Sequence, residues 1–186
     1  MPPPKKAAKK SAKKAGKQDP EVRGANHLRR AFEHMGRLEV LQATLKASAA
    51  EAITALANLA QQEVQRGKNK DAADLLRASE HLSFAALAGD GSAGGRLTAE
   101  LKHSIAEHFA ELTRRADELW EEKEQHASLL AAIYRSARKS AAEAFKSRAY
   151  HRALELARAA EVLAHIKEHE PHNLATGKKN LKLKAA

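Results

Sequence analysis

Residues 75–82 read LLRASEHL, and residues 156–163, which lie 81 positions further along the chain, read LARAAEVL. Both stretches follow the pattern L-x-R-A-x-E-x-L. The two leucines of each stretch are seven residues apart, which places them on one face of an α-helix. We therefore predict that the chain contains two copies of one helical unit, with Leu75 and Leu156 buried at equivalent positions.

The match extends outward from these stretches at the same offset and without a gap. Further matched pairs are His27 with His108, Leu28 with Phe109, Leu38 with Leu119, Ala60 with Ala141, Val64 with Phe145 and Ala72 with Ala153. The correspondence divides the chain into five expected segments. These are a Lys/Pro/Ala tail (1–18), a helical hairpin repeat (19–88), a Gly-rich linker (89–96), a second repeat (97–170) and a basic C-terminal tail (171–186).

Both repeats carry a helical pattern. No proline lies between Pro20 and Pro171, so this interval lacks the residue that breaks helices most strongly. Asp19-Pro20-Glu21 is typical of a helix start, because Asp caps free N–H groups and Pro fits the first turn. Apolar residues then recur every three or four positions. The expected fold class is all-α: internally duplicated helical hairpins that form an elongated helical bundle, with disordered basic termini.

The pattern leaves the first helix of each repeat open. It either runs unbroken for about 45 residues, or bends near Ser48 in the first repeat and near Ala127–Ser128 in the second. The hairpins are expected to pack as a four-helix core, and the segments before them either lie alongside or project as a coiled arm. The hairpins span about 49–88 and 130–169, and the preceding segments about 21–47 and 97–127.

The composition limits the chemistry of the chain. Of its 186 residues, 43% are hydrophobic but only 4% are aromatic, so we expect a core of Ala, Leu and some Ile. Cysteine is absent, which excludes disulfides and thiolate metal sites and fits a reducing compartment. No stretch reaches the ~18 apolar residues of a transmembrane segment, and the N-terminus is not typical of a signal peptide. We expect a cytoplasmic protein without a cofactor.

The net charge of +10 is concentrated at the two ends of the chain. Residues 1–18 contain seven lysines and residues 177–186 contain four, and neither segment contains an acidic residue. The remaining 22 Lys and Arg residues face all 23 Asp and Glu residues, which leaves the middle at −1. The candidate nucleic-acid-binding residues are Lys5, Lys6, Lys9, Lys10, Lys13, Lys14, Lys17, Lys178, Lys179, Lys182 and Lys184.

The spaced lysine pairs of the N-terminal tail, separated by Ala, Ser and Pro, resemble the tails of linker histones and of bacterial histone-like proteins. The resemblance implies binding to nucleic acid, and a cationic chain releases counterions from any phosphate backbone. The tail has no aromatic residue to stack on bases and no Arg to read guanine, so binding should not depend on sequence. An inert solubilising tail, or one that binds anionic membranes or acidic proteins, is the alternative interpretation.

The glycine-rich segment GDGSAGG at 89–95 contains the string G-x-G-x-x-G of dinucleotide-binding folds. That motif requires a preceding strand within a βαβ unit. Residues 82–88 instead continue the helical pattern and contain no β-branched residue. No Gly-Lys-Ser/Thr follows, which also excludes a phosphate-binding P-loop. We interpret the segment as a polar linker between the two repeats.

Residues 141–160 resemble the helical hairpin of tetratricopeptide repeats. The matching residues are Phe145, Tyr150, Ala153 and Ala160, and in the first repeat Val64, Gly67, Ala72 and Ser79 match the family pattern less well. The family's usual Trp, Leu-Gly pair and closing Pro are not in register, and its repeat period is missing. The resemblance implies a scaffold that binds proteins and is not an enzyme.

Histidine is the one abundant residue type with catalytic or metal-binding chemistry. His165, His169 and His172 lie close together in HIKEHEPH, and the first two are one helical turn apart, which suits a metal ion. The interpretation we favour is a polar helix end at which His is favoured by the dipole, so we expect no metal site. Glu100-x-x-His103 is half of a di-iron carboxylate motif, which needs a second copy that the first repeat does not supply.

Two further features of the second repeat are ambiguous. Arg158 and His165, with six residues between them, fit the Arg–His spacing of the higher-eukaryote and prokaryote nucleotide-binding domains, a helical family that includes RNases. The polar residue that normally follows this Arg is Ala159 here. Trp120, the only tryptophan, either anchors a partner or packs half-buried between helices.

The sequence thus predicts a non-enzymatic helical module that associates with nucleic acid independently of sequence. Its basic tails would contact phosphates, and its helices would bind a protein partner or self-associate. The first alternative is a tetratricopeptide-like adaptor with incidental tails, and the second is a helical RNase-like domain. The nucleic-acid-binding interpretation also predicts association with the nucleoid.

Overall fold

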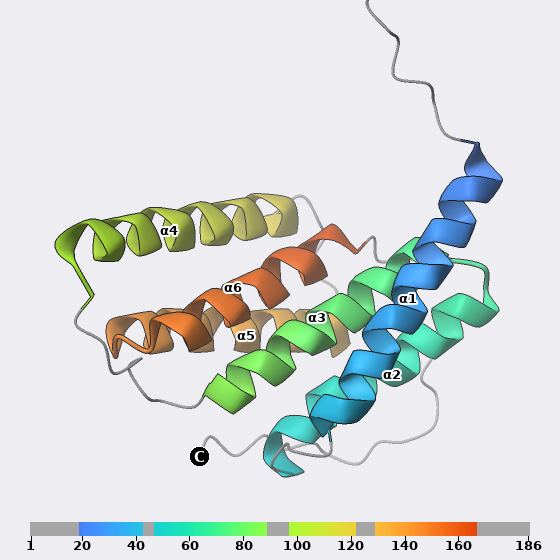
Figure 1. Cartoon of the computed structure of the whole chain (residues 1–186), viewed down its shortest axis with the longest axis horizontal. Coiled ribbons are helices and arrows are strands. Elements are labelled where there is room, and N and C mark those ends of the chain that lie inside the picture. The colour runs from blue at the N-terminus through green and yellow to red at the C-terminus, as the bar shows by residue number, and fades with distance from the viewer. Residues whose placement is uncertain (1–18, 43–46, 89–96, 122–128, 167–186) are drawn as a thin grey trace, which may run out of the picture.

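The computed structural model describes residues 19–42, 47–88, 97–121 and 129–166, which form six helices (Figure 1). They are α1 (Pro20–Gln42), α2 (Ala47–Gln65), α3 (Asn69–Ala88), α4 (Ala99–Glu121), α5 (Leu129–Lys146) and α6 (Tyr150–His165). This part of the chain contains no strand, which confirms the all-α class. None of its helices has the length and apolar composition needed to cross a membrane.

Local sequence sets the start of each half. The carboxylate of Asp19 accepts a hydrogen bond of 3.0 Å from the N–H of Glu21, which caps α1 as predicted. In the second half, the hydroxyl of Thr98 accepts a bond of 3.2 Å from the N–H of Leu101 at the start of α4. Both caps satisfy N–H groups that have no partner within the helix.

The turns between α2 and α3 and between α5 and α6 have the same geometry. Gly67 has φ +74°, and its N–H donates to the carbonyl of Val64 at 2.9 Å. Arg148, 81 positions later, has φ +65°, and its N–H donates to the carbonyl of Phe145 at 3.0 Å. A second bond closes each turn, from Lys68 to Glu63 and from Ala149 to Ala144, so both are Schellman caps.

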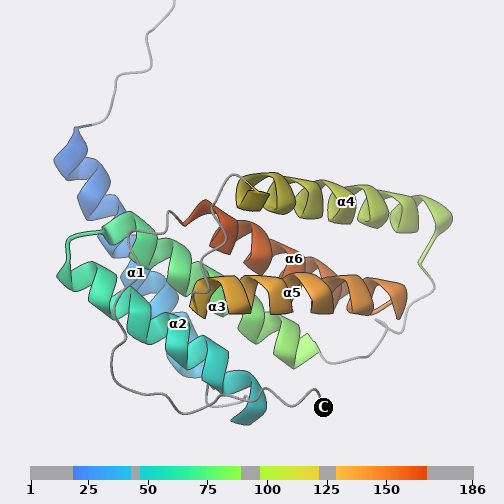
Figure 2. The ribbon, with the colours of Figure 1, turned by 180° about the vertical axis from the view of Figure 1, so that it is seen from behind.

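α3 and α6 form the centre of the molecule. α1 and α2 pack against α3, α4 and α5 pack against α6, and α3 packs against α6 (Figures 1 and 2). α1 runs parallel to α3, since Asn69 bonds to the Gly24 carbonyl near the start of both helices and His34 contacts Glu80 further along both. α3 and α6 run antiparallel, so one half is related to the other by an approximate two-fold rotation (Figure 1).

Small residues occupy fully buried positions of the two central helices. Ala72 and Ala78 of α3 and their counterparts Ala153 and Ala159 of α6 are all 0% exposed. Alanine side chains fill little volume, which fits a core with few aromatic residues. Leu75 and Leu156 are 1% and 7% exposed, so both are buried as predicted.

Of the two alternatives for the first helix of each repeat, the structure has the divided one, with α2 beginning at Ala47 and α5 at Leu129. α1 and α2 are separate helices that both lie along α3, and α4 and α5 both lie along α6. A single straight helix of that length could not place both its parts against one partner. α1 and α4 also pack on their own halves rather than projecting as an arm (Figure 2). The second hairpin turns between Lys146, where α5 ends, and Tyr150, where α6 begins.

Candidate functional site

The eleven lysines predicted to bind nucleic acid lie outside the described residues, as does the glycine-rich segment at 89–96. What the structure gives is the position of the helices that precede or follow them. The start of α1 and the end of α6 both lie at the end of the bundle where α3 begins (Figure 1). Residues 82–88, which precede the glycines, are part of α3, as the helical interpretation predicted.

The histidine cluster is described only in part. His165 is exposed at the end of α6, whereas His169 and His172 lie outside the described residues. Among the residues that the structure describes, no group of three or more His, Cys, Asp or Glu side chains is arranged to hold a metal ion. His103 pairs with Glu107 one turn away, at 3.2 Å, with both side chains exposed.

Buried carboxylates connect the central helices to their neighbours. Glu80 of α3 is 7% exposed and contacts the ring of His34 on α1 at 2.5 Å, with Arg37 at 3.4 Å. At the equivalent place in the second half, Glu161 of α6 contacts Arg115 of α4 at 3.3 Å. The same carboxylate position thus receives a cationic or hydrogen-bonding partner from the first helix of each half.

A third carboxylate joins the two halves. Glu155 of α6 is 5% exposed; one of its oxygens lies 2.8 Å from Nδ1 of His81 on α3, and the other accepts a 2.6 Å bond from Arg158. Burial raises the pKa of Glu155, but the hydrogen bond from His81 and the charges of His81 and Arg158 outweigh it, so the pKa is lowered overall. The Arg of the proposed Arg–His motif is therefore bound to this carboxylate.

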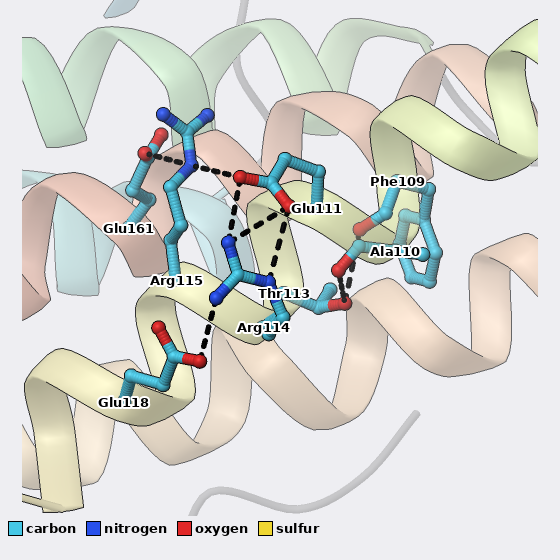
Figure 3. A network of polar contacts seen from close by, with 8 residues as sticks. All are labelled: Phe109, Ala110, Glu111, Thr113, Arg114, Arg115, Glu118 and Glu161. Carbon is cyan, nitrogen blue, oxygen red and sulfur yellow. Dashed lines mark hydrogen bonds and ion pairs between the residues drawn. The ribbon is translucent and has the colours of Figure 1, made fainter.

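The outer surface of α4 carries a network of exposed ion pairs (Figure 3). Arg114 lies between Glu118, at 2.6 Å, and Glu111, at 2.8 Å. Arg115 reaches Glu111 at 3.5 Å as well as Glu161, so it connects this surface to α6. The hydrogen bond from Arg114 lowers the pKa of Glu111. Because these side chains are exposed, solvent screens the pairs, and the network organises the surface more than it stabilises the fold.

Trp120 packs within the second half. Its ring stacks on Tyr134 of α5, with centroids 4.1 Å apart, and it is partly buried against the core. Beside the stack, Asp117 accepts bonds from the Tyr134 hydroxyl at 3.0 Å and from Arg138 at 2.7 Å. The bond from Arg138 is the largest effect on the Asp117 pKa, which is lowered although burial opposes the shift. Packing is therefore the role the structure gives Trp120.

The sequence analysis missed an apolar surface on α1. Val22, Phe32 and Val40 are 50%, 59% and 73% exposed, respectively. Ala31 lies nine positions from both valines, which is two and a half helical turns, and it is buried against the core. The two valines thus lie on the side of α1 opposite the core. This spacing was readable from the sequence, but the stripe that faces the core was the stronger signal.

The hairpin of residues 141–160 has the contacts expected from its aromatic residues. Phe145 stacks on Phe109 of α4 at 4.3 Å and meets Tyr150 edge-on at 5.4 Å, and Ala153 and Ala160 are fully buried. No protein-family model matches the chain, and neither a curated protein nor a solved structure shows significant similarity to it.

Proposed function

We propose that this chain is a non-enzymatic helical module that binds nucleic acid without sequence preference through its lysine-rich ends. The observation that carries the proposal is the separation of charge: eleven lysines and no acid in two terminal segments, against a middle at −1. A segment of this composition neutralises phosphates without needing a fixed geometry. The positions of α1 and α6 support joint action, because the two segments attach at the same end of the bundle (Figure 1).

The test measures how affinity for duplex DNA depends on salt. If the seven lysines engage about five to seven phosphates at about −0.9 each, the slope of log affinity against log salt for the N-terminal segment should be near −4 to −6. In the full-length chain, replacing the seven lysines of residues 1–18 with Gln should reduce the slope towards the part due to the C-terminal four. Random and defined duplexes should bind alike. An unchanged slope in the Gln variant contradicts the proposed role of the tail.

We further infer that the helical part self-associates through the outer face of α1. In an antiparallel pair of α1 helices, the numbers of the two residues that face each other have a constant sum. The register that places Val22 of one copy on Val40 of the other has the sum 62, so it also places Arg29 on Glu33. The side chains of Arg29 and Glu33 are 70% and 53% exposed and available for exchange between copies. A single helix face is smaller than a standard interface of ~1,600 Å², so we expect a weak, concentration-dependent dimer.

Charge reversal tests this pairing. Arg29→Glu alone and Glu33→Arg alone should each weaken the dimer in sedimentation experiments, because like charges then face each other. Mixing the two variants should restore association, since each copy then offers the opposite charge. If the mixture associates no better than either variant, α1 is not paired in this register.

Two other functions are alternatives to nucleic-acid binding. A tetratricopeptide-like adaptor is favoured by the packing of Phe145, Tyr150, Ala153 and Ala160, and capture of a protein partner by variants without basic ends would support it. An RNase is disfavoured, because Arg158 is bound to Glu155 and His165 is exposed at the helix end. The shared 81-residue offset of helices, turns and buried residues also supports an origin by internal duplication within an elongated bundle.

A further inference from the structure

The balanced charge of the middle of the chain conceals a basic surface on α5. Residues 129–148, which comprise α5 and its following turn, contain five Lys and Arg residues and one Glu, a net charge of +4. The equivalent residues of the first half, 48–67, contain one Arg and two Glu residues, a net charge of −1. α4 carries three Lys and Arg residues against six acids, which offsets the excess in the total.

The basic side chains of α5 form one stripe. Arg135, Lys139 and Lys146 are spaced four and seven positions apart, which places them within a narrow arc of the helix surface. All three are exposed, and Arg148, in the turn that follows α5, is exposed as well. Arg138 lies outside it, because its guanidinium is bound to Asp117.

These cations are free to bind an external anion. Lys139 is 81% exposed, and its nearest acid, Glu143, is 4.0 Å away, at the limit of an ion pair. Within the described residues, no hydrogen bond or ion pair involves the side chains of Arg135, Lys146 or Arg148. The apolar face of α5 is buried, as Leu130, Ile133 and Ala137 show. The helix therefore lacks the exposed apolar face by which amphipathic helices insert into membranes.

We propose that the α5 stripe, Arg135, Lys139 and Lys146, together with the exposed Arg148 of the following turn, is a second phosphate-binding surface for a nucleic acid duplex. From Arg135 to Lys146 it extends for about 17 Å at 1.5 Å per residue, the axial length of about five phosphates of one strand. α5 begins beside the end of α6 and runs away from it (Figure 1).

This inference rests on the proposed function for its ligand but on different residues, so the two can fail separately. The internal repeat supplies the substitutions: Arg135→Thr, Lys139→Asn and Lys146→Gln introduce the exposed residues of the first half, Thr54, Asn58 and Gln65. Because the equivalent helix of the first half carries these residues, the triple variant should fold. A matched control removes the same charge elsewhere by Arg30→Gln, Arg77→Gln and Lys102→Gln, at exposed positions of α1, α3 and α4.

The salt dependence of binding to a 20-base-pair duplex is measured for the full chain and both triple variants. The stripe variant should lose about 2 to 3 from the slope, at about 0.9 per phosphate, and the control variant less than 1. The reverse exchange, Thr54→Arg, Asn58→Lys and Gln65→Lys, should increase the slope by a similar amount.

Equal slopes for the stripe and control variants would overturn the proposal, as would binding to anionic lipid vesicles without binding to duplex. If the tail variant changes nothing while the stripe variant abolishes binding, the tail hypothesis fails and the stripe stands.

Discussion

The two halves of the molecule, residues 19–88 and 97–166, share a skeleton and differ on their outer surfaces. The α2–α3 and α5–α6 turns have the same hydrogen bonds, and the contact of His34 with Glu80 recurs as that of Arg115 with Glu161. Residues in these contacts hold neighbouring helices together, so a substitution of one residue affects the residue that it contacts. The skeleton is therefore the part that both halves retain.

The outer surfaces follow a different rule. Along the first helix of each half the charges are reversed: Arg30, Glu33 and Arg37 of α1 correspond to Glu111, Arg114 and Glu118 of α4. The exposed Phe32 and Val40 correspond to Thr113 and Glu121. The uncharged outer side of α2 corresponds to the basic stripe of α5. Because these positions are exposed and contribute little to packing, their divergence gives each half a different outer surface.

The prediction with the largest expected effect tests whether Leu75 and Leu156 are equivalent core positions of the two halves. Leu75→Ala and Leu156→Ala each remove a buried side chain and leave a cavity, so each should lower the free energy of unfolding by about 3 kcal/mol. Urea denaturation of the full chain measures both. A loss below about 1 kcal/mol for one variant, with a large loss for the other, would break the equivalence of the halves.

A second comparison uses the interhelical carboxylates. The side chain of Glu80 is 9% exposed and that of Glu161 is 17% exposed, with a half-exposed Arg115 as its partner. Glu80→Ala leaves the ring of His34 without its partner in a largely buried site and should cost about 2 kcal/mol. Glu161→Ala breaks a more solvated pair and should cost about 0.5 kcal/mol. Glu80→Gln, which keeps an acceptor, is the control, and equal losses for the two Ala variants would contradict the assigned difference.

Much of this skeleton was predictable from sequence, because its signals are local. Gly67, the start at Pro20 and the apolar spacing around Leu75 each report on their own segment. For the first helix of each repeat, the local pattern allowed either one continuous helix or a bend near Ser48 and near Ala127–Ser128, and it did not decide between them. Neither 43–46 (ATLK) nor 122–128 (EKEQHAS) contains Gly or Pro. What separates α1 from α2, and α4 from α5, is packing of both helices on a common partner, which overrides helix propensity.

The candidate site was less predictable than the fold. Counting charges over the whole middle of the chain gave −1, because the acids of α4 cancel the bases of α5 in the sum but lie on another helix. The paired contacts of Glu155 with His81 likewise join residues 74 positions apart. Such contacts depend on how α3 crosses α6, which no local pattern encodes.

The turns allow a smaller test of the comparison. Gly67 adopts a positive φ without a steric penalty, whereas Arg148 pays one at the equivalent place. Gly67→Ala should therefore cost about 1 kcal/mol, and Arg148→Gly should stabilise by about 0.5 kcal/mol after the loss of unfolded-state entropy is included. Thermal denaturation measures both changes. Destabilisation by Arg148→Gly would show that its side chain makes a contact worth more than the backbone strain.

The smallest effect concerns a pair that only the second half has. Asp117 bonds to Arg138 and Tyr134, and its pKa is lowered below the usual value of 3.8; Gly36 takes its place in the first half. A carboxyl group whose pKa is lowered by folding stabilises the protein above its unfolded pKa, and that stability is lost as the pH falls through the lower folded value. Asp117→Asn should thus cost about 0.5 to 1 kcal/mol at pH 7, a figure reduced because the side chain is 42% exposed.

Urea denaturation at a series of pH values should show this difference unchanged down to about pH 5 and shrinking below about pH 4. Glu33→Gln, which removes an exposed carboxylate from α1, is the control and should have a smaller effect throughout. A difference between wild type and Asp117→Asn that stays constant to pH 2 would mean that the charge of Asp117 contributes nothing, and that its hydrogen-bonding geometry alone holds α4 to α5.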